Sequence, residues 1–406
     1  MAKKLHVEYQ QFAGSMDTMG FRMMAKLMPQ SILKKMMMKM SAPKTRPLDD
    51  YEARQVDSDE IVEVEENKIW LVRHTCGGDN PKDLKTMGLA PSQQNYDKCL
   101  EAAKLIGDDA VQQLEKDWTT LKEYLAIDPK EGKKGEYNKA CAGMYSIMIV
   151  VKLKSGDLLL FNPVPIHDGT KLDEWMKIMG DVKYAVIGSC YHTLFLPDTL
   201  RRYPEAIYIG TKISEEKLKA ANALKKPKLD YDALVESDIT KINEILEPEG
   251  VTLKFTKGDM LTQSIFLVAY ETGVEVDLLY GLHDTCACDY SKAEGIFKGC
   301  DNDPRHFIGR LFQWRLVNKP NSPYGYLPPY RFAAMDPKSG FSKMNWPRPA
   351  DDGSSCKEMA NSLRDILKMD YKSVVSVHWG LLSAEDFRLS INEDWKWLDE
   401  SSLLPE

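Results

Sequence analysis

Two side chains able to bind a metal ion, Cys190 and His192, follow the apolar run at residues 184–187. Thiolate and imidazole are both zinc ligands. Residues two apart in an extended chain point to the same side, so this segment can present both groups to one ion. The alternative interpretation is structural, with Cys190 as a small buried side chain and His192 hydrogen-bonded to the backbone of its own loop.

Three further candidates stand near the ends of strand-like runs. Asp284 closes "VEVDLLYGLHD", where a carboxylate is costly to bury without a cation or hydrogen-bond donors. His378 ends "KSVVSVH", and the carboxyl ends of strands are where α/β proteins place their chemistry. Asp259 follows Gly258, where its alternative role is local hydrogen bonding in a turn. Metal binding and proton transfer are therefore the chemistries to expect.

The elements that must position these residues alternate between strands and helices. Residues 68–75 predict a first strand, and residues 144–163 predict a hairpin that turns near Gly156. Short helices and buried strands then alternate. Residues 251–284 predict three more strands, and residues 355–400 predict a helix, a strand and a helix. Strands interleaved with helices indicate sheets that are covered by helices.

The chain divides into an arm and one large domain. Residues 1–60 form a basic, Met-rich arm and linker; residues 61–406 form the domain, with a helical insertion at about 79–140 and an aromatic, Pro-rich loop at about 303–349. Residues 16–40 hold nine of the 20 methionines in a pattern that predicts amphipathic helices. These helices either pack on their own domain or dock on a partner protein or a membrane surface.

Composition excludes several classes of function. Of the 406 residues, 54 are basic and 61 acidic, and the net charge of -7 offers no general attraction for nucleic acid. The sequence contains no run of 18 apolar residues, so we expect no transmembrane span. The eight cysteines form no regular framework and no apolar leader follows the first lysines, so we expect a reducing, cytoplasmic location, with an organelle as the alternative. Phosphate-binding glycine loops and a G-x-S-x-G motif are absent from the sequence, which disfavours nucleotide-dependent enzymes and serine hydrolases.

The order of these segments resembles the metallo-β-lactamase superfamily. It runs from the hairpin with "GDLLLFNPVP", through the loop "GSCYHTLFLP" and the segment "KGDMLTQSIFLVA", to a final strand ending in "HWG". The resemblance is greatest to a poorly characterised branch of plants, algae and cyanobacteria with a similar H-x-x-F-L loop. It covers roughly residues 68–400 and implies an αββα sandwich, an α/β fold with its site at one end of the sheets.

The resemblance also implies a ligand set, which this chain keeps only in part. The motif H-x-H-x-D-H of the family falls on Cys190, His192, Leu194 and Phe195, its loop histidine on Asp259, its strand-end aspartate on Asp284 and its last histidine on His378. Leu and Phe side chains cannot coordinate a metal ion. We therefore expect a degenerate site that holds at most one ion.

Two functions follow. The first is a hydrolase-like enzyme that uses one zinc or iron ion on a small-molecule substrate, with Asp284 or His378 moving protons; a mononuclear iron oxidoreductase belongs to the same class. The second is a metal-free, non-catalytic scaffold that acts as a binding or assembly subunit, for which the apolar Leu194 and Phe195 are the evidence.

Overall fold

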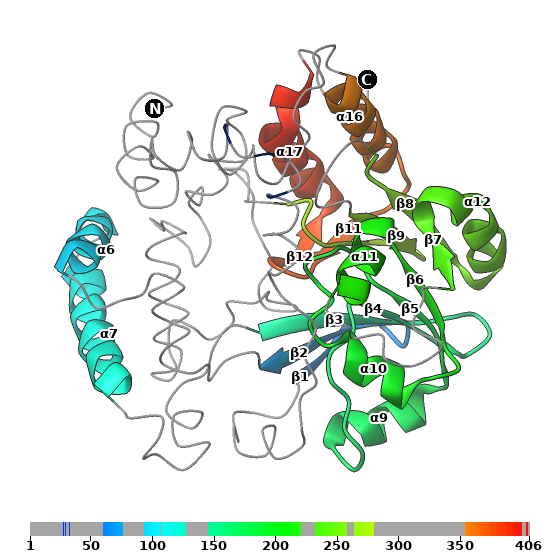
Figure 1. Cartoon of the computed structure of the whole chain (residues 1–406), viewed down its shortest axis with the longest axis horizontal. Helices are drawn as coiled ribbons and strands as arrows, with labels where there is room; N and C mark the ends of the chain where they lie inside the picture. Colours follow the sequence, from blue (N-terminus) through cyan, green and yellow to red (C-terminus); the bar gives the residue numbers. More distant parts are fainter. Residues whose placement is uncertain are drawn as a thin grey trace.

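The computed structural model describes part of the chain, and the helices and strands within it form two sheets with helices on both sides (Figure 1). The described residues are 27, 29, 32, 60–75, 93–106, 108–126, 145–220, 232–257, 264–279, 354–399, 403 and 404. Two of the predicted site residues, Asp259 and Asp284, lie outside them, as do nearly all of residues 16–40 and the whole of the 303–349 loop.

The first sheet has seven strands, which lie in chain order from β1 to β7. Strands β1 to β4 pair antiparallel, and β4 to β7 pair parallel. The strands are β1 (Glu60–Glu65), β2 (Ile69–Thr75), β3 (Tyr145–Lys152), β4 (Leu158–Phe161), β5 (Val182–Val186), β6 (Ile207–Gly210) and β7 (Ala233–Leu234). The predicted hairpin is β3 and β4, and its turn includes Gly156 at a φ of 93°.

The second sheet has five strands in the order β12-β11-β10-β9-β8. Its one parallel pair is β10 with β11, and the other neighbours run antiparallel. The strands are β8 (Val251–Phe255), β9 (Ile265–Ala269), β10 (Thr272–Glu275), β11 (Ser373–Ser376) and β12 (Gly380–Ser383). The described residues of the range 251–284 form three strands, as predicted, but β10 ends at Glu275, well before Asp284.

The inner faces of the two sheets share one hydrophobic core. Side chains from both sheets meet in it, among them Ile149, Phe161, Leu253, Leu267 and Val375, all fully buried. Helix α12 (Val235–Leu246) adds apolar residues to the same core. Burying two half-apolar sheets against each other removes both inner faces from water, which is the main stabilisation available to such a pair.

Helices cover the outer faces. Helix α9 (Lys171–Met179) packs on β2, β3 and β4, and helices α10 (Leu196–Arg202) and α11 (Lys212–Ala220) pack on β5 and β6. Helices α16 (Ser354–Leu367) and α17 (Ala384–Trp395) pack on the second sheet. The layers are thus helix, sheet, sheet, helix, and the predicted αββα sandwich is confirmed.

Two further helices lie within the predicted insertion. They are α6 (Gln93–Ile106) and α7 (Asp108–Ala126), and the Tyr96 and Trp118 rings pack between them with centroids 5.4 Å apart. Of all the described helices, none combines the length and hydropathy that a bilayer span requires.

A buried carboxylate fixes the outer helix layer. Asp173 of α9 is fully buried, and its carboxylate accepts hydrogen bonds from Lys177 and Arg202 and from the backbone N–H of Gly169. Burial alone would raise the pKa of Asp173, but these donors outweigh it and lower the pKa to about 2. Arg202 belongs to α10, so the pair links two helices that cover the first sheet.

Acid should therefore weaken this link. The pKa of Asp173 is lower in the folded than in the unfolded chain, so its charge stabilises the fold above about pH 4, and this contribution is lost as the pH falls to about 2. We expect Asp173→Asn to cost about 2 kcal/mol at neutral pH and to flatten this part of the acid transition. Urea unfolding over pH 2 to 7 measures both, with the exposed Asp181→Asn as the control; an unchanged acid transition would contradict the assignment.

Candidate metal centre

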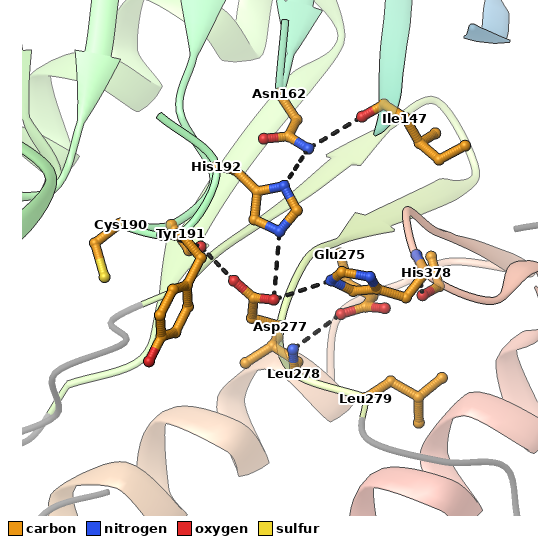
Figure 2. Close-up of polar contacts among 12 residues, drawn as sticks. Ile147, Asn162, Cys190, Tyr191, His192, Glu275, Asp277, Leu278, Leu279 and His378 are labelled. Atoms are coloured by element: carbon orange, nitrogen blue, oxygen red, sulfur yellow. Dashed lines mark hydrogen bonds and ion pairs between the residues drawn. The ribbon is translucent and has the colours of Figure 1, made fainter. Parts of the chain in front are cut away.

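Three side chains from separate segments converge at one end of the sheets: His192, Asp277 and His378 (Figure 2). Each offers one ligand atom, and these atoms all lie within 4.8 Å of one another. The Asp277 Oδ1 atom is 3.0 Å from His378 Nε2 and 3.4 Å from His192 Nε2. Within the part of the chain that the structure describes, no other group of His, Cys, Asp and Glu side chains meets this criterion.

The register of β10 and β11 places Asp277 beside His378. These strands are parallel, and their last paired residues are Glu275 and Ser376. Asp277 and His378 each follow two positions later, so they leave the same edge of the sheet side by side. His192 comes from the other sheet, six residues after the end of β5.

Gly188 lets the two sheets approach at this edge. It follows β5, and its carbonyl accepts a hydrogen bond of 2.8 Å from the Ile265 N–H of β9. A Cβ atom at this position would lie 2.3 Å from Val276 and 2.7 Å from the Phe161 ring. A side chain here would force the β5 exit away from the β10 end, so the absence of a side chain is what brings His192 within reach of Asp277.

The turn that carries Asp277 is held by buried donors. Asp277 has a φ of 57°, in the left-handed region that Asp tolerates better than most residues. Trp395 Nε1 donates to the Leu278 carbonyl at 2.8 Å, and Trp379 Nε1 donates to the Leu279 carbonyl at 3.0 Å. Both indoles are buried. Two consecutive carbonyls are thus anchored directly after Asp277, which fixes where its carboxylate points.

The Asp277 carboxylate is an acceptor for three side chains. Oδ1 faces both imidazoles, and Oδ2 accepts from the Ser189 hydroxyl. Burial would raise the pKa of Asp277, but the charges and hydrogen bonds of His192 and His378 outweigh it and hold that pKa well below its usual range. The site therefore carries a fixed negative charge at its centre.

His378 and Glu275 can hold a proton next to that charge. Burial would lower the pKa of His378, but its hydrogen bond to Asp277 and the charges of Asp277 and Glu275 raise it above its ordinary value. Glu275 is fully buried, and desolvation raises its pKa to about 7 despite hydrogen bonds from Ser376 and from the Leu278 N–H. A carboxyl group with a pKa near neutral pH is suited to acid–base chemistry.

Of the side chains predicted from the sequence, the structure brings His192 and His378 together. Cys190 is not in the group; it is buried, desolvation raises the pKa of its thiol to about 12, and its sulfur points away from the His192 ring in Figure 2. Lys217, also fully buried, donates from Nζ to the Cys190 carbonyl at 2.6 Å.

Asp277 and Asn162 are the residues that sequence reasoning missed. Asp277 lies inside the run "VEVDLLYGLHD", so the argument that a carboxylate there needs a partner applied to it as much as to Asp284. Asn162 stands in "FNP" after β4, where an Asn before Pro gives a turn signal but no sign of a contact with His192.

Metallo-β-lactamases are among the solved structures to which the chain is similar. For the enzyme from Hirschia baltica the identity is 9% over 86% of this chain and 100% of that one, with a TM-score of 0.36. For FIM-1 from Pseudomonas aeruginosa in the mono-zinc form the identity is 10% over 84% of this chain and 97% of that one, with a TM-score of 0.38. For the enzyme from Erythrobacter litoralis the identity is 8% over 86% of this chain and 99% of that one, with a TM-score of 0.40. No protein-family model matches the chain, and no curated protein matches it. The fold assignment therefore depends on the sheets and layers described above.

The indole anchors give a test of how the site is built. Trp395→Phe keeps an aromatic ring but removes the donor to the buried Leu278 carbonyl, so we expect a loss of about 1–3 kcal/mol in the free energy of unfolding, measured in urea. Trp175→Phe is the matched control, because half-buried Trp175 retains a ring for its edge contact with Trp70. Equal losses in the two variants would argue against a special role for the Trp395 N–H.

Proposed function

We propose that this protein is a hydrolase-like enzyme that binds one zinc or iron ion through His192, Asp277 and His378. The observation that carries the proposal is the convergence of two imidazole nitrogens and one carboxylate oxygen within 4.8 Å. In a tetrahedral site with ligand bonds of about 2.0–2.1 Å, neighbouring ligand atoms lie roughly 3.3 Å apart. The distances of 3.0 and 3.4 Å from Asp277 Oδ1 to the two histidines are close to that spacing.

The donor set fits either metal. Two histidines and one carboxylate, with a further position left for water, are typical of catalytic zinc and of non-haem iron(II). When bound, such an ion supplies Lewis acidity, which lowers the pKa of a coordinated water and polarises a carbonyl or ester oxygen. Asp277 provides the negative charge that compensates a cation, and Ser189 orients that carboxylate.

The neighbouring side chains favour one ion over two. The positions at which the resemblance implies ligands for a second ion hold Leu194 and Phe195. Phe195 is buried, and its ring packs edge-on against His74 with centroids 5.4 Å apart. A packed aromatic ring occupies the place of a ligand, which supports the expectation of a mononuclear centre.

Proton transfer in the proposed reaction falls to Glu275, because His378 is itself a ligand in this proposal. The Glu275 carboxyl group is fully buried, and its pKa, raised by burial to about 7, lets it both accept and donate a proton near neutral pH. The substrate class is a small molecule with a carbonyl or ester group.

A metal-free scaffold is the second candidate function, and one observation favours it. The three acceptor contacts of Asp277, from Ser189, His192 and His378, already satisfy its carboxylate without an ion. A binding or assembly subunit would need nothing more from this cluster than the stability that such a network gives to the ends of the two sheets.

Metal analysis distinguishes the two candidates. We expect the full chain, purified and then exposed to zinc or iron(II), to retain about one equivalent after gel filtration, and His192→Ala, Asp277→Asn and His378→Ala each to retain less than about a tenth. Cys190→Ala, a neighbour whose sulfur points away from the cluster, is the control and should retain the full amount. Less than about a tenth of an equivalent in the wild-type chain would leave the scaffold as the function.

A further inference from the structure

The side chain of Asn162 contacts the proposed ligand His192 on the side of the imidazole ring opposite Asp277 (Figure 2). Asn162 directly follows β4 and is 2% exposed. Its Nδ2 atom lies 3.0 Å from the Ile147 carbonyl oxygen and 2.7 Å from His192 Nδ1. One amide group thus faces a backbone carbonyl and an imidazole nitrogen at the same time.

The Ile147 carbonyl decides which end of the amide faces His192. A backbone carbonyl can only accept, so the amide atom 3.0 Å from it must be the NH2 group. The opposite orientation would place two oxygens at that distance and would turn both amide hydrogens away from the acceptors. Because the NH2 group has two hydrogens, one bonds Ile147 and the other is available to His192 Nδ1.

The consequence concerns the proton of His192. A neutral imidazole carries one N–H, and Nδ1, which accepts from Asn162, cannot be the atom that carries it. The proton is therefore on Nε2, which faces Asp277 Oδ1 at 3.4 Å. We propose that Asn162 is a positioning residue that holds His192 in the Nε2–H tautomer. The proton on Nε2 then occupies the position that a metal ion would take at this nitrogen.

This arrangement is the reverse of the usual support for a metal-binding histidine. Such a histidine normally donates its second N–H to a carboxylate or a carbonyl, which leaves the other nitrogen free for the ion, and loss of that partner costs 10–100-fold in affinity. Here the outer partner donates instead. The effect on metal affinity rests on the proposed function, whereas the tautomer does not.

Asn162→Asp reverses the polarity of the contact with little change in shape. Asn162 has a φ of 62°, a conformation that Asp also tolerates. A carboxylate there accepts from Nδ1–H, so the proton of His192 should move to Nδ1 and the zinc dissociation constant should fall about 10–100-fold. Asn243→Asp is the matched control, because Asn243 Nδ2 also donates to a backbone carbonyl, that of Leu253, at 3.0 Å, far along the chain from the cluster.

The experiment uses the metal-free full chain labelled with 15N-histidine. Long-range 1H–15N spectra identify the protonated nitrogen of His192, assigned by comparison with His192→Gln, and competition with a chromogenic chelator gives the zinc affinity. We expect the proton on Nε2 in the wild type and in Asn243→Asp, and on Nδ1 in Asn162→Asp, with tighter zinc binding in that variant alone.

A wild-type spectrum with the proton on Nδ1, or a tautomer that Asn162→Asp does not change, overturns the proposal. If Asn162→Asp does not fold, the wild-type spectrum still decides it. Tautomers as expected in chains that bind no zinc would support the role of Asn162 and remove the metal-dependent function instead. If the wild-type chain binds one equivalent of zinc but its metal-free form carries the proton on Nδ1, the result would support the metal-dependent function and overturn the role of Asn162.

Discussion

The burial of one carboxylate at the junction of two sheets is the constraint on which this site depends. The Asp277 side chain is 12% exposed, and an ionised carboxylate cannot remain in such a place without donors. Its donors come from both halves of the sandwich: Ser189 and His192 from the exit of β5, and His378 from the end of β11. The same contacts that make the carboxylate tolerable therefore also tie the sheets together at this end, where the lack of a side chain at Gly188 lets them meet.

The fold could be predicted from the sequence wherever a buried, apolar run of residues forms a strand. The apolar runs of β2 to β6, β8, β9 and β11 predict strands where the structure has them, and with them the layer order. Strand β1 was not predicted, because its "EIVEVE" alternates Glu with apolar residues directly after a polar linker. The end of β10 was placed too late for the opposite reason: Val276, Leu278 and Leu279 are buried, yet they pack from a turn and not from a strand. Apolar residues indicate that a segment is buried, but they do not indicate whether its backbone forms a strand or a turn.

The site could be predicted only in part, for two physical reasons. His192 and His378 follow apolar strands and were found by that position. Pairing Cys190 with His192 assumed an extended backbone, whereas a turn closes there, with the His192 N–H 3.3 Å from the Ser189 carbonyl. Asp277 was missed because its place beside His378 follows from the register that pairs Glu275 with Ser376. Pairing between distant strands leaves no local signature in the sequence.

A proton and a metal ion compete for the same three atoms, and the surroundings decide between them. An N–H···O contact and a pair of bonds to one ion need similar spacings, so the distances that support a metal ion here are also compatible with a hydrogen-bonded proton. The surrounding side chains stabilise the proton: Asn162 donates where a metal-bound histidine needs an acceptor, and the buried Lys217 adds a cation next to the segment that carries His192. Each raises the free energy of placing a second cation at Asp277. The ligand atoms of this centre are thus those of a metal site, whereas their supporting contacts are those of a hydrogen-bonded network, and the balance between the two lies in residues that touch no ion.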